Sequence, residues 1–173
     1  MFKVIALKPA LSALVVLALA SPAMAKSKVV TETLKIEATP QAVFAAIQGY
    51  RTSNLHHRKL ISYDGTSALV DEQLEGVPVL GSVHCMWVEK EVPYQRIDYK
   101  MVKSDKFVSG SGSYVILSGG SDSVILELSS ELESGCKIPF AKEIGQMAAH
   151  KDMKLRLQQI KHMSETARIA QNP

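Results

Sequence analysis

The sequence has few cysteines, no concentrated charge of one sign and none of the common catalytic motifs. Its 173 residues include two cysteines, Cys85 and Cys136, and neither belongs to a C-x-x-C pair. A thioredoxin-like redox role therefore has no support. The formal net charge is only +3, with no run of basic residues, which argues against a nucleic-acid partner.

Motifs that define several enzyme classes are also missing. The sequence contains no G-x-S-x-G, no H-E-x-x-H, no phosphate-binding loop and no dinucleotide fingerprint. Hydrolases, zinc proteases, P-loop enzymes and nicotinamide-dependent enzymes consequently lose their sequence support. We expect no cofactor.

The N-terminus has the three parts of a secretory signal. Lys3 and Lys8 supply positive charge, Leu11 to Ala20 is apolar and uncharged, and Ala23-Met24-Ala25 is an A-x-A cleavage pattern. A membrane anchor is the alternative, but spanning a bilayer takes about 20 apolar residues and this stretch is shorter. The pattern therefore favours cleavage.

We predict a leader over residues 1–25, cleavage between Ala25 and Lys26, and one domain over residues 26–173. The mature chain would have 148 residues, with 18 Lys and Arg against 17 Asp and Glu because Lys3 and Lys8 are removed. That length suits one domain with a real core. We expect a periplasmic or secreted protein with no stable membrane insertion after cleavage.

An oxidising compartment would permit a disulfide between Cys85 and Cys136. Two buried thiols that pack as small apolar groups are the alternative. Sequence spacing does not say whether the two Cα atoms come within bridging distance. Both possibilities stay open.

The mature chain begins with a strand followed by short helical segments. Residues 28–38 alternate and are rich in β-branched residues, which predicts a strand. Thr39 suits a helix N-cap, Pro40 suits the first helical position, and Gly49 ends the helix. The polar segment from Tyr50 to Arg58 is expected to form a second small helix and to be exposed.

A series of alternating runs then predicts an antiparallel sheet with one buried face. Asp64-Gly65 is a strong hairpin signal. Ser109-Gly110-Ser111-Gly112-Ser113 is unusual inside a strand, where glycine marks a bulge or close packing. The expected strands are residues 59–63, 67–74, 82–92, 96–103, 107–117 and 123–132.

Residues 139–170 have helical spacing of apolar residues and no internal proline. The order is therefore a strand, one or two short helices, a meander of strands and one long terminal helix. This order predicts the α+β class, with helices on one face of a curved antiparallel sheet.

Several segments resemble the START/Bet-v-1-like superfamily, also called SRPBCC, over roughly residues 28–168. Ile36–Phe44 resembles the opening I-x-A-x-P-x-x-V-[FW], and Val92–Tyr99 resembles the P-x-R-I-x-Y turn. Gly112–Ile116 with Ser123–Leu128 resembles the G-x-W-x-F … T-x-V-x-L hairpin, with tyrosine and serine in place of Trp and Thr. Leu157–Lys161 resembles the closing L-x-x-[IL]-K, and the most similar branch is polyketide-cyclase-like and coenzyme-Q-binding-like.

The resemblance implies a helix-grip fold, in which six or seven antiparallel strands wrap around a long C-terminal helix after two short helices. It also implies a cavity for an apolar or amphipathic small molecule that is lipid-, quinone- or polyketide-like. The alternative is a filled core. The candidate lining residues are Tyr99, Met101, Tyr114, Ile116, Leu126, Leu128, Met147, His150 and Leu157.

The residues that could act as a general acid or base in such a cavity are His150, Tyr99 and Glu72. No metal site is expected. His56 and His57 are adjacent and diverge in direction, while His84 and Cys85 point to opposite faces of one strand.

Three functions therefore compete. The first is a periplasmic carrier of a hydrophobic small molecule, and the second is a cyclase or dehydratase that uses the same cavity. The third is an accessory module for another periplasmic protein, with no ligand. A cavity of several hundred cubic ångströms would favour the first two, and a filled interior the third.

Overall fold

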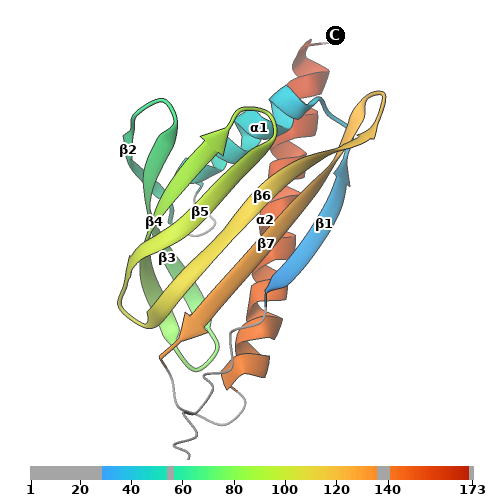
Figure 1. Ribbon diagram of the computed structural model, residues 1–173. Helices are drawn as coiled ribbons and strands as arrows, with labels where there is room; N and C mark the ends of the chain where they lie inside the picture. Colours follow the sequence, from blue (N-terminus) through green and yellow to red (C-terminus); the bar gives the residue numbers. More distant parts are fainter. Residues whose placement is uncertain (1–28, 54–56, 136–140, 172–173) are drawn as a thin grey trace, which may run out of the picture.

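The computed structural model describes residues 29–53, 57–135 and 141–171, the last range without the side chains of 141–145, 148 and 168–171. Seven strands and a short helix precede one long helix (Figure 1). The elements are β1 (Val30–Ile36), α1 (Pro40–Gly49), the 3-10 helix η1 (Tyr50–Thr52), β2 (Lys59–Tyr63), β3 (Ser67–Val77), β4 (Gly81–Val92), β5 (Arg96–Ser104), β6 (Phe107–Gly120), β7 (Ser123–Ser134) and α2 (Ala141–Gln171).

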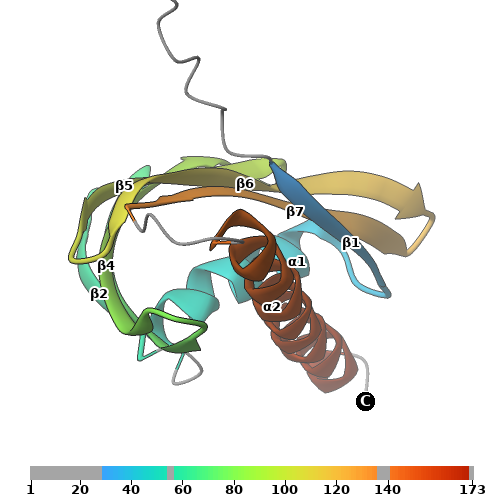
Figure 2. The ribbon, with the colours of Figure 1, turned by 90° about the horizontal axis from the view of Figure 1, so that it is seen from below.

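The strands form one antiparallel sheet in the order β1-β7-β6-β5-β4-β3-β2. Strands β2 to β7 follow as a meander, and β1 joins the sheet beside β7. Figure 2 shows the sheet curving around α2, with α1 on the same concave side. This arrangement confirms the predicted helix-grip α+β fold.

Helix α1 starts where its sequence predicts. The Thr39 side chain accepts a hydrogen bond from the Ala42 N–H at 3.3 Å, and Pro40 occupies the first turn. Val43, Phe44 and Ile47 are buried on the face toward the core. The second predicted helix is the single 3-10 turn η1, and residues 54–56 after it lie outside the described residues.

The core has two parts. The larger one lies between α1, α2 and strands β1, β5, β6 and β7, and its α2 residues Met153, Leu157 and Ile160 are almost fully buried. The smaller one contains Leu74, Val83, Cys85 and Trp87 on β3 and β4, with Tyr99 contacting both parts. No helix within the described ranges is long and apolar enough to cross a membrane.

Two glycines of β6 make room for aromatic side chains. A Cβ at Gly110 would lie 2.8 Å from Leu132 and 3.0 Å from the Trp87 ring. A Cβ at Gly112 would overlap the Ser129 carbonyl and the Tyr99 hydroxyl, which donates a hydrogen bond to that carbonyl at 2.6 Å. The glycines inside this strand therefore mark close packing, one of the two predicted possibilities.

The Gly112→Ala variant should lower the free energy of unfolding by about 2–3 kcal/mol, because the added methyl displaces Tyr99 from Ser129. Denaturant unfolding measures the effect. Ser111→Ala, an exposed neighbour on the same strand, is the control and should change stability little. Equal stability of the two variants would contradict the packing role of Gly112.

Candidate functional site

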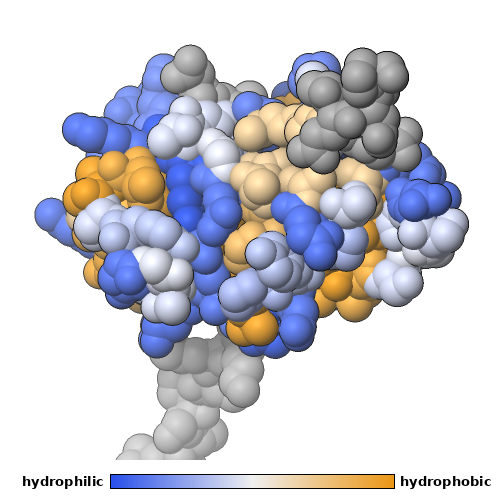
Figure 3. Space-filling view, turned by 90° about the horizontal axis from the view of Figure 1, so that it is seen from above, coloured by the Kyte–Doolittle hydropathy of each residue, from blue (hydrophilic) through white to orange (hydrophobic). Residues whose placement is uncertain are grey.

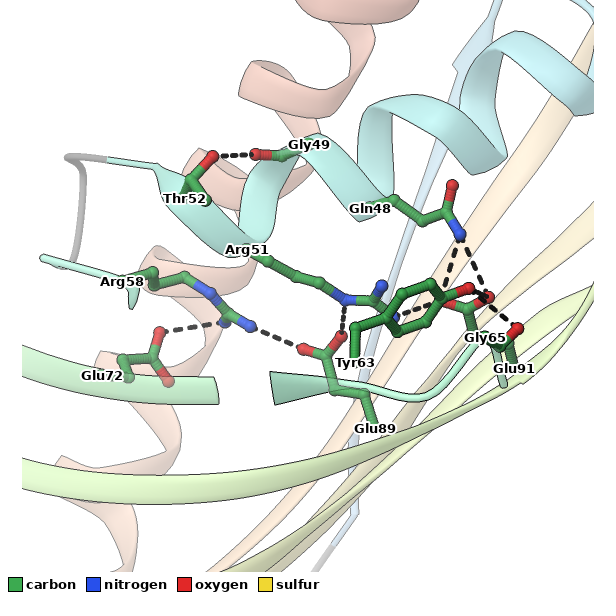
Figure 4. A network of polar contacts seen from close by, with 10 residues as sticks. All are labelled: Gln48, Gly49, Arg51, Thr52, Arg58, Tyr63, Gly65, Glu72, Glu89 and Glu91. Atoms are coloured by element: carbon green, nitrogen blue, oxygen red, sulfur yellow. Dashed lines mark hydrogen bonds and ion pairs between the residues drawn. The ribbon is translucent and has the colours of Figure 1, made fainter. Parts of the chain in front are cut away.

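Seven charged side chains form an alternating series of acids and bases between the sheet and the helices that it curves around. We call it the charged network, and its order is Asp152, Arg156, Glu72, Arg58, Glu89, Arg51, Glu91. Figure 4 shows the part that lies between η1, β3 and β4. The network links α2 to the β3 and β4 strands, where the larger apolar core does not reach.

The α2 end of the network centres on Glu72 of β3. Its Oε1 receives Arg156 at 3.0 Å and Arg58 at 3.1 Å. Arg156 also binds Asp152, one helical turn earlier, at 2.6 Å. Glu72 therefore holds the helix and the segment before β2 against the same point of the sheet.

The other end runs along β4. Arg58 donates to Glu89 Oε1 at 2.6 Å, and Arg51 donates to Glu89 Oε2 at 2.7 Å. Arg51 also pairs with Glu91 at 2.5 Å. Gln48 and Tyr63 donate to the same Glu91 carboxylate, so the network ends among polar groups near the surface.

Tyr50 packs inside the network. Its ring lies 5.0 Å from the Arg58 guanidinium and 5.9 Å from that of Arg156. Cation–π attraction of this kind is strongest where water is excluded. Tyr50 thus fills the space between two guanidiniums that belong to distant parts of the sequence.

Burial and pairing set the charge states. Burial alone would lower the pKa of Arg58, but Glu72 and Glu89 outweigh it and raise that pKa. Burial would raise the pKa of Glu91, but hydrogen bonds from Gln48, Arg51 and Tyr63 bring it below its usual value. Arg58 and Glu91 therefore stay charged at neutral pH, within a network of four acidic and three basic side chains.

A cavity of about 40 Å³ lies between the network and α2. That volume holds about three water molecules, well below the roughly 300–1,000 Å³ of ordinary ligand pockets. Its wall joins the charged groups to apolar and aromatic ones: Arg58, Glu72, Leu74, Trp87, Glu89, Tyr99, Tyr114, Leu128, Ser130, Leu132, Ala149, Asp152, Met153 and Arg156.

Two N–H donors on residues of this wall lack a hydrogen-bond acceptor among the described residues. They are the Arg58 Nε and the Trp87 Nε1. Both side chains are buried. A buried donor without an acceptor is costly, about 1–3 kcal/mol, so the cavity favours an occupant that supplies an acceptor atom.

The structure brings four of the predicted site residues together at the cavity: Tyr99, Tyr114, Leu128 and Glu72. Others pack elsewhere in the interior. Leu126 and Leu157 are fully buried core residues, with Ile116 packed against them. Met101 packs against the smaller core beside Trp87.

Two further predicted lining residues lie at the surface. Met147 is 67% exposed, and His150 binds Glu32 of β1 at 2.6 Å with about half its side chain in solvent. The cavity side of α2 instead carries Met153 and Arg156. The prediction was wrong for these two because spacing along the helix did not fix its rotation.

The arginines of the charged network could not be identified as site residues from the sequence. The polar segment that contains Arg51 and Arg58 is predicted to be exposed, but both side chains are buried. Glu89 had a usable signal, because it shares the inward face of β4 with Cys85 and Trp87. Arg156 lies three residues after Met153, a spacing that places both on one side of α2.

The histidine and cysteine of β4 diverge as predicted. His84 pairs with Asp71 at the surface, whereas Cys85 is buried and its thiol contacts Ser104 at 3.5 Å. Burial raises the pKa of the Cys85 thiol to about 11, which makes it unreactive. Cys136 and His56 lie outside the described residues. A disulfide between Cys85 and Cys136 therefore stays a prediction, as does the expectation that His56 binds no metal.

A second hollow, open and about 380 Å³ in volume, lies between α1 and the C-terminal part of α2. Alanines and Met163 make up most of its wall, together with Thr39 and Gln41. Figure 3, which views the molecule from above, shows hydrophobic areas separated by hydrophilic side chains.

Arg58→Met should lower the free energy of unfolding by about 3–5 kcal/mol, because it leaves Glu72 and Glu89 buried without their shared partner. Denaturant unfolding tests this. Arg96→Met removes an exposed pair with Asp98 and should cost less than about 1 kcal/mol. Similar costs for both variants would refute the structural role of Arg58.

The lowered pKa of Glu91 predicts a specific loss of stability in acid. Its contribution is present above the ordinary value near 4.5 and is lost as pH falls through the lower folded-state value. Melting temperatures between pH 7 and pH 3 should therefore fall less steeply for Glu91→Gln than for the unchanged protein. Asp122→Asn, in the exposed β6–β7 turn, should leave the slope unchanged, and an unchanged slope for Glu91→Gln would disprove the assignment.

No family model and no curated protein matches the chain, but solved structures resemble it in fold. The Zhui aromatase/cyclase from Streptomyces sp. R1128 aligns with a TM-score of 0.70 at 13% identity, over 80% of this chain and 93% of that one. A Thermus thermophilus protein gives 0.69 at 16% identity, over 81% and 99%. A START superfamily protein from Mycobacterium smegmatis gives 0.63 at 14% identity, over 80% and 98%. The chain therefore has the START-like (SRPBCC) helix-grip fold that its motifs predicted.

Proposed function

We propose that this protein is exported and binds a small molecule that has a neutral, oxygen-bearing end and an apolar body. The observation that carries the proposal is the pair of buried N–H donors, Arg58 Nε and Trp87 Nε1, on residues of the cavity wall. A ligand oxygen that reached either N–H group would supply the acceptor that this donor lacks. The leader predicted over residues 1–25 supports export.

The charges around the cavity favour a neutral acceptor over an anion. Each guanidinium of the network already faces carboxylates, and the acids outnumber the bases by one. An added carboxylate would meet Glu72 and Glu89 without finding a free counter-charge. Ketone, quinone, ester or amide carbonyls need only the N–H donors.

The apolar body requires the cavity to widen. About 40 Å³ admits the polar end of a ligand and no more. The adjoining wall is apolar on both sides, with Ala149 and Met153 on α2 facing Leu74 and Leu132 on the sheet. Separating these side chains would make room at the cost of lengthening the Arg156–Glu72 pair between α2 and β3, and it would leave the pairs at Glu89 and Arg51 in place.

Catalysis has weaker support. The Tyr99 hydroxyl donates to Ser129, and burial raises its pKa. Glu72 is held by two guanidiniums, and His150 lies outside the cavity. The three candidate acid–base residues are thus engaged elsewhere, which favours a carrier over a cyclase or dehydratase.

An accessory role without a ligand is the second candidate, since the interior is nearly filled and the α1–α2 hollow is open and apolar. The two candidates differ in a simple measurement. Native mass spectrometry of protein purified from its own periplasm should find a bound small molecule if the protein is a carrier. An empty, stable protein supports the accessory role.

Ligand preference can be tested with three compounds of similar shape: 2-acetylnaphthalene, 2-naphthoate and 2-ethylnaphthalene. Fluorescence of Trp87, the only tryptophan, should report binding because it lines the cavity. We expect the ketone to bind more tightly than the carboxylate or the hydrocarbon. Tighter binding of 2-naphthoate would contradict the neutral-acceptor proposal.

The Trp87→Phe variant gives the matched test by calorimetry. Loss of one N–H donor should weaken binding of the ketone about 3- to 10-fold, which corresponds to one hydrogen bond. The affinity for 2-ethylnaphthalene should stay unchanged. Met101→Leu, beside Trp87 but outside the cavity wall, is the control. Equal loss for both ligands in Trp87→Phe would assign Trp87 to packing alone.

A further inference from the structure

Strand β2 is an edge strand with unusual exposure. It pairs only with β3 in the sheet, and all five of its residues are exposed. Figure 1 shows it at the outer margin of the sheet, on the side opposite β1. An edge strand presents backbone groups that can pair with another strand.

The other edge is covered by α2. The Lys161 ammonium donates to the Lys35 carbonyl of β1 at 2.9 Å, and Glu165 accepts from the Glu37 N–H just after it at 3.0 Å. Edge β1 is therefore protected by helix side chains. The same helix does not flank β2, which lies at the far margin of the sheet.

The side chains of β2 are poorly suited to a solvent-facing edge. Leu60, Ile61 and Tyr63 are 36%, 47% and 46% exposed. Edges that stay single are usually protected by central charges or proline, and the only charge on β2 is Lys59 at its start. The bulge between Leu60 and Ser62 bends the strand but leaves Leu60 and Ile61 in solvent, whereas the half-exposed Tyr63 also contacts Arg51 and Glu91.

We propose that β2 pairs with β2 of a second copy of this chain, antiparallel about a two-fold axis between Ile61 and Ser62. In this register Lys59 faces Asp64 of the second copy, and Leu60 faces its Tyr63. Each pair occurs twice because the interface is symmetric. The strand is thus complementary to itself in both charge and apolar character.

Asp64 is well placed for this pairing. Its Oδ1 accepts hydrogen bonds from the Thr66 and Ser67 N–H groups, which fix the turn after β2. These bonds lower the pKa of Asp64 and keep it charged. The carboxylate therefore presents a fixed negative charge at the end of the edge, opposite the position of Lys59 in the second copy.

Sedimentation velocity and light scattering across about 1–200 µM protein test the proposal. We expect a monomer–dimer equilibrium, and Ile61→Lys should raise the dissociation constant at least about tenfold by placing two like charges beside the axis. Leu117→Lys, an equally exposed apolar position on β6, should leave it unchanged. Thermal melting verifies that both variants fold.

A charge exchange makes the test specific to the register. Lys59→Glu alone and Asp64→Lys alone each place like charges opposite one another and should be monomeric. Mixed together, they should form a heterodimer, because both cross-pairs then attract. The proposal is overturned if the protein is monomeric at all concentrations, including the case in which β2 pairs only with a strand of a different protein. It is also overturned if Ile61→Lys leaves the dimer unaffected, or if the mixture forms no heterodimer.

Discussion

The ion pairs of Glu72 with Arg58 and Arg156 are the constraint on which the rest of the structure depends. Apolar packing holds α2 to strands β1, β6 and β7, whereas the charged network joins it to β3 and β4. Buried ion pairs contribute little net stability but cost much when half-broken. They act here by fixing one separation between the helix and the far strands, and that separation sets the size of the cavity.

Two glycines on β6 shape the opposite wall of the cavity. Gly110 and Gly112 let the Trp87 and Tyr99 rings approach β6, so the cavity is bounded by aromatic faces on one side and by the network on the other. The interior is therefore polar at its centre and apolar around it. The proposed ligand, with a carbonyl end and an apolar body, has the same order.

Periodicity explains why the fold could be predicted from the sequence. Val124, Leu126 and Leu128 alternate cleanly and are buried on one face of β7. The network could not be predicted in the same way, because Arg58 meets partners 14 and 31 residues away. Those contacts depend on strand register and on the rotation of α2, which also decides that Arg156 rather than His150 faces the cavity.

A double-mutant cycle between Glu72 and Arg156 measures whether this ion pair holds α2 to the sheet. Unfolding free energies of the unchanged protein, Glu72→Gln, Arg156→Gln and the double variant give the coupling between sheet and helix. We expect a coupling of at least about 1 kcal/mol, since both side chains are largely buried where they pair. Additive effects of the two substitutions would show that the network does not hold α2 to the sheet.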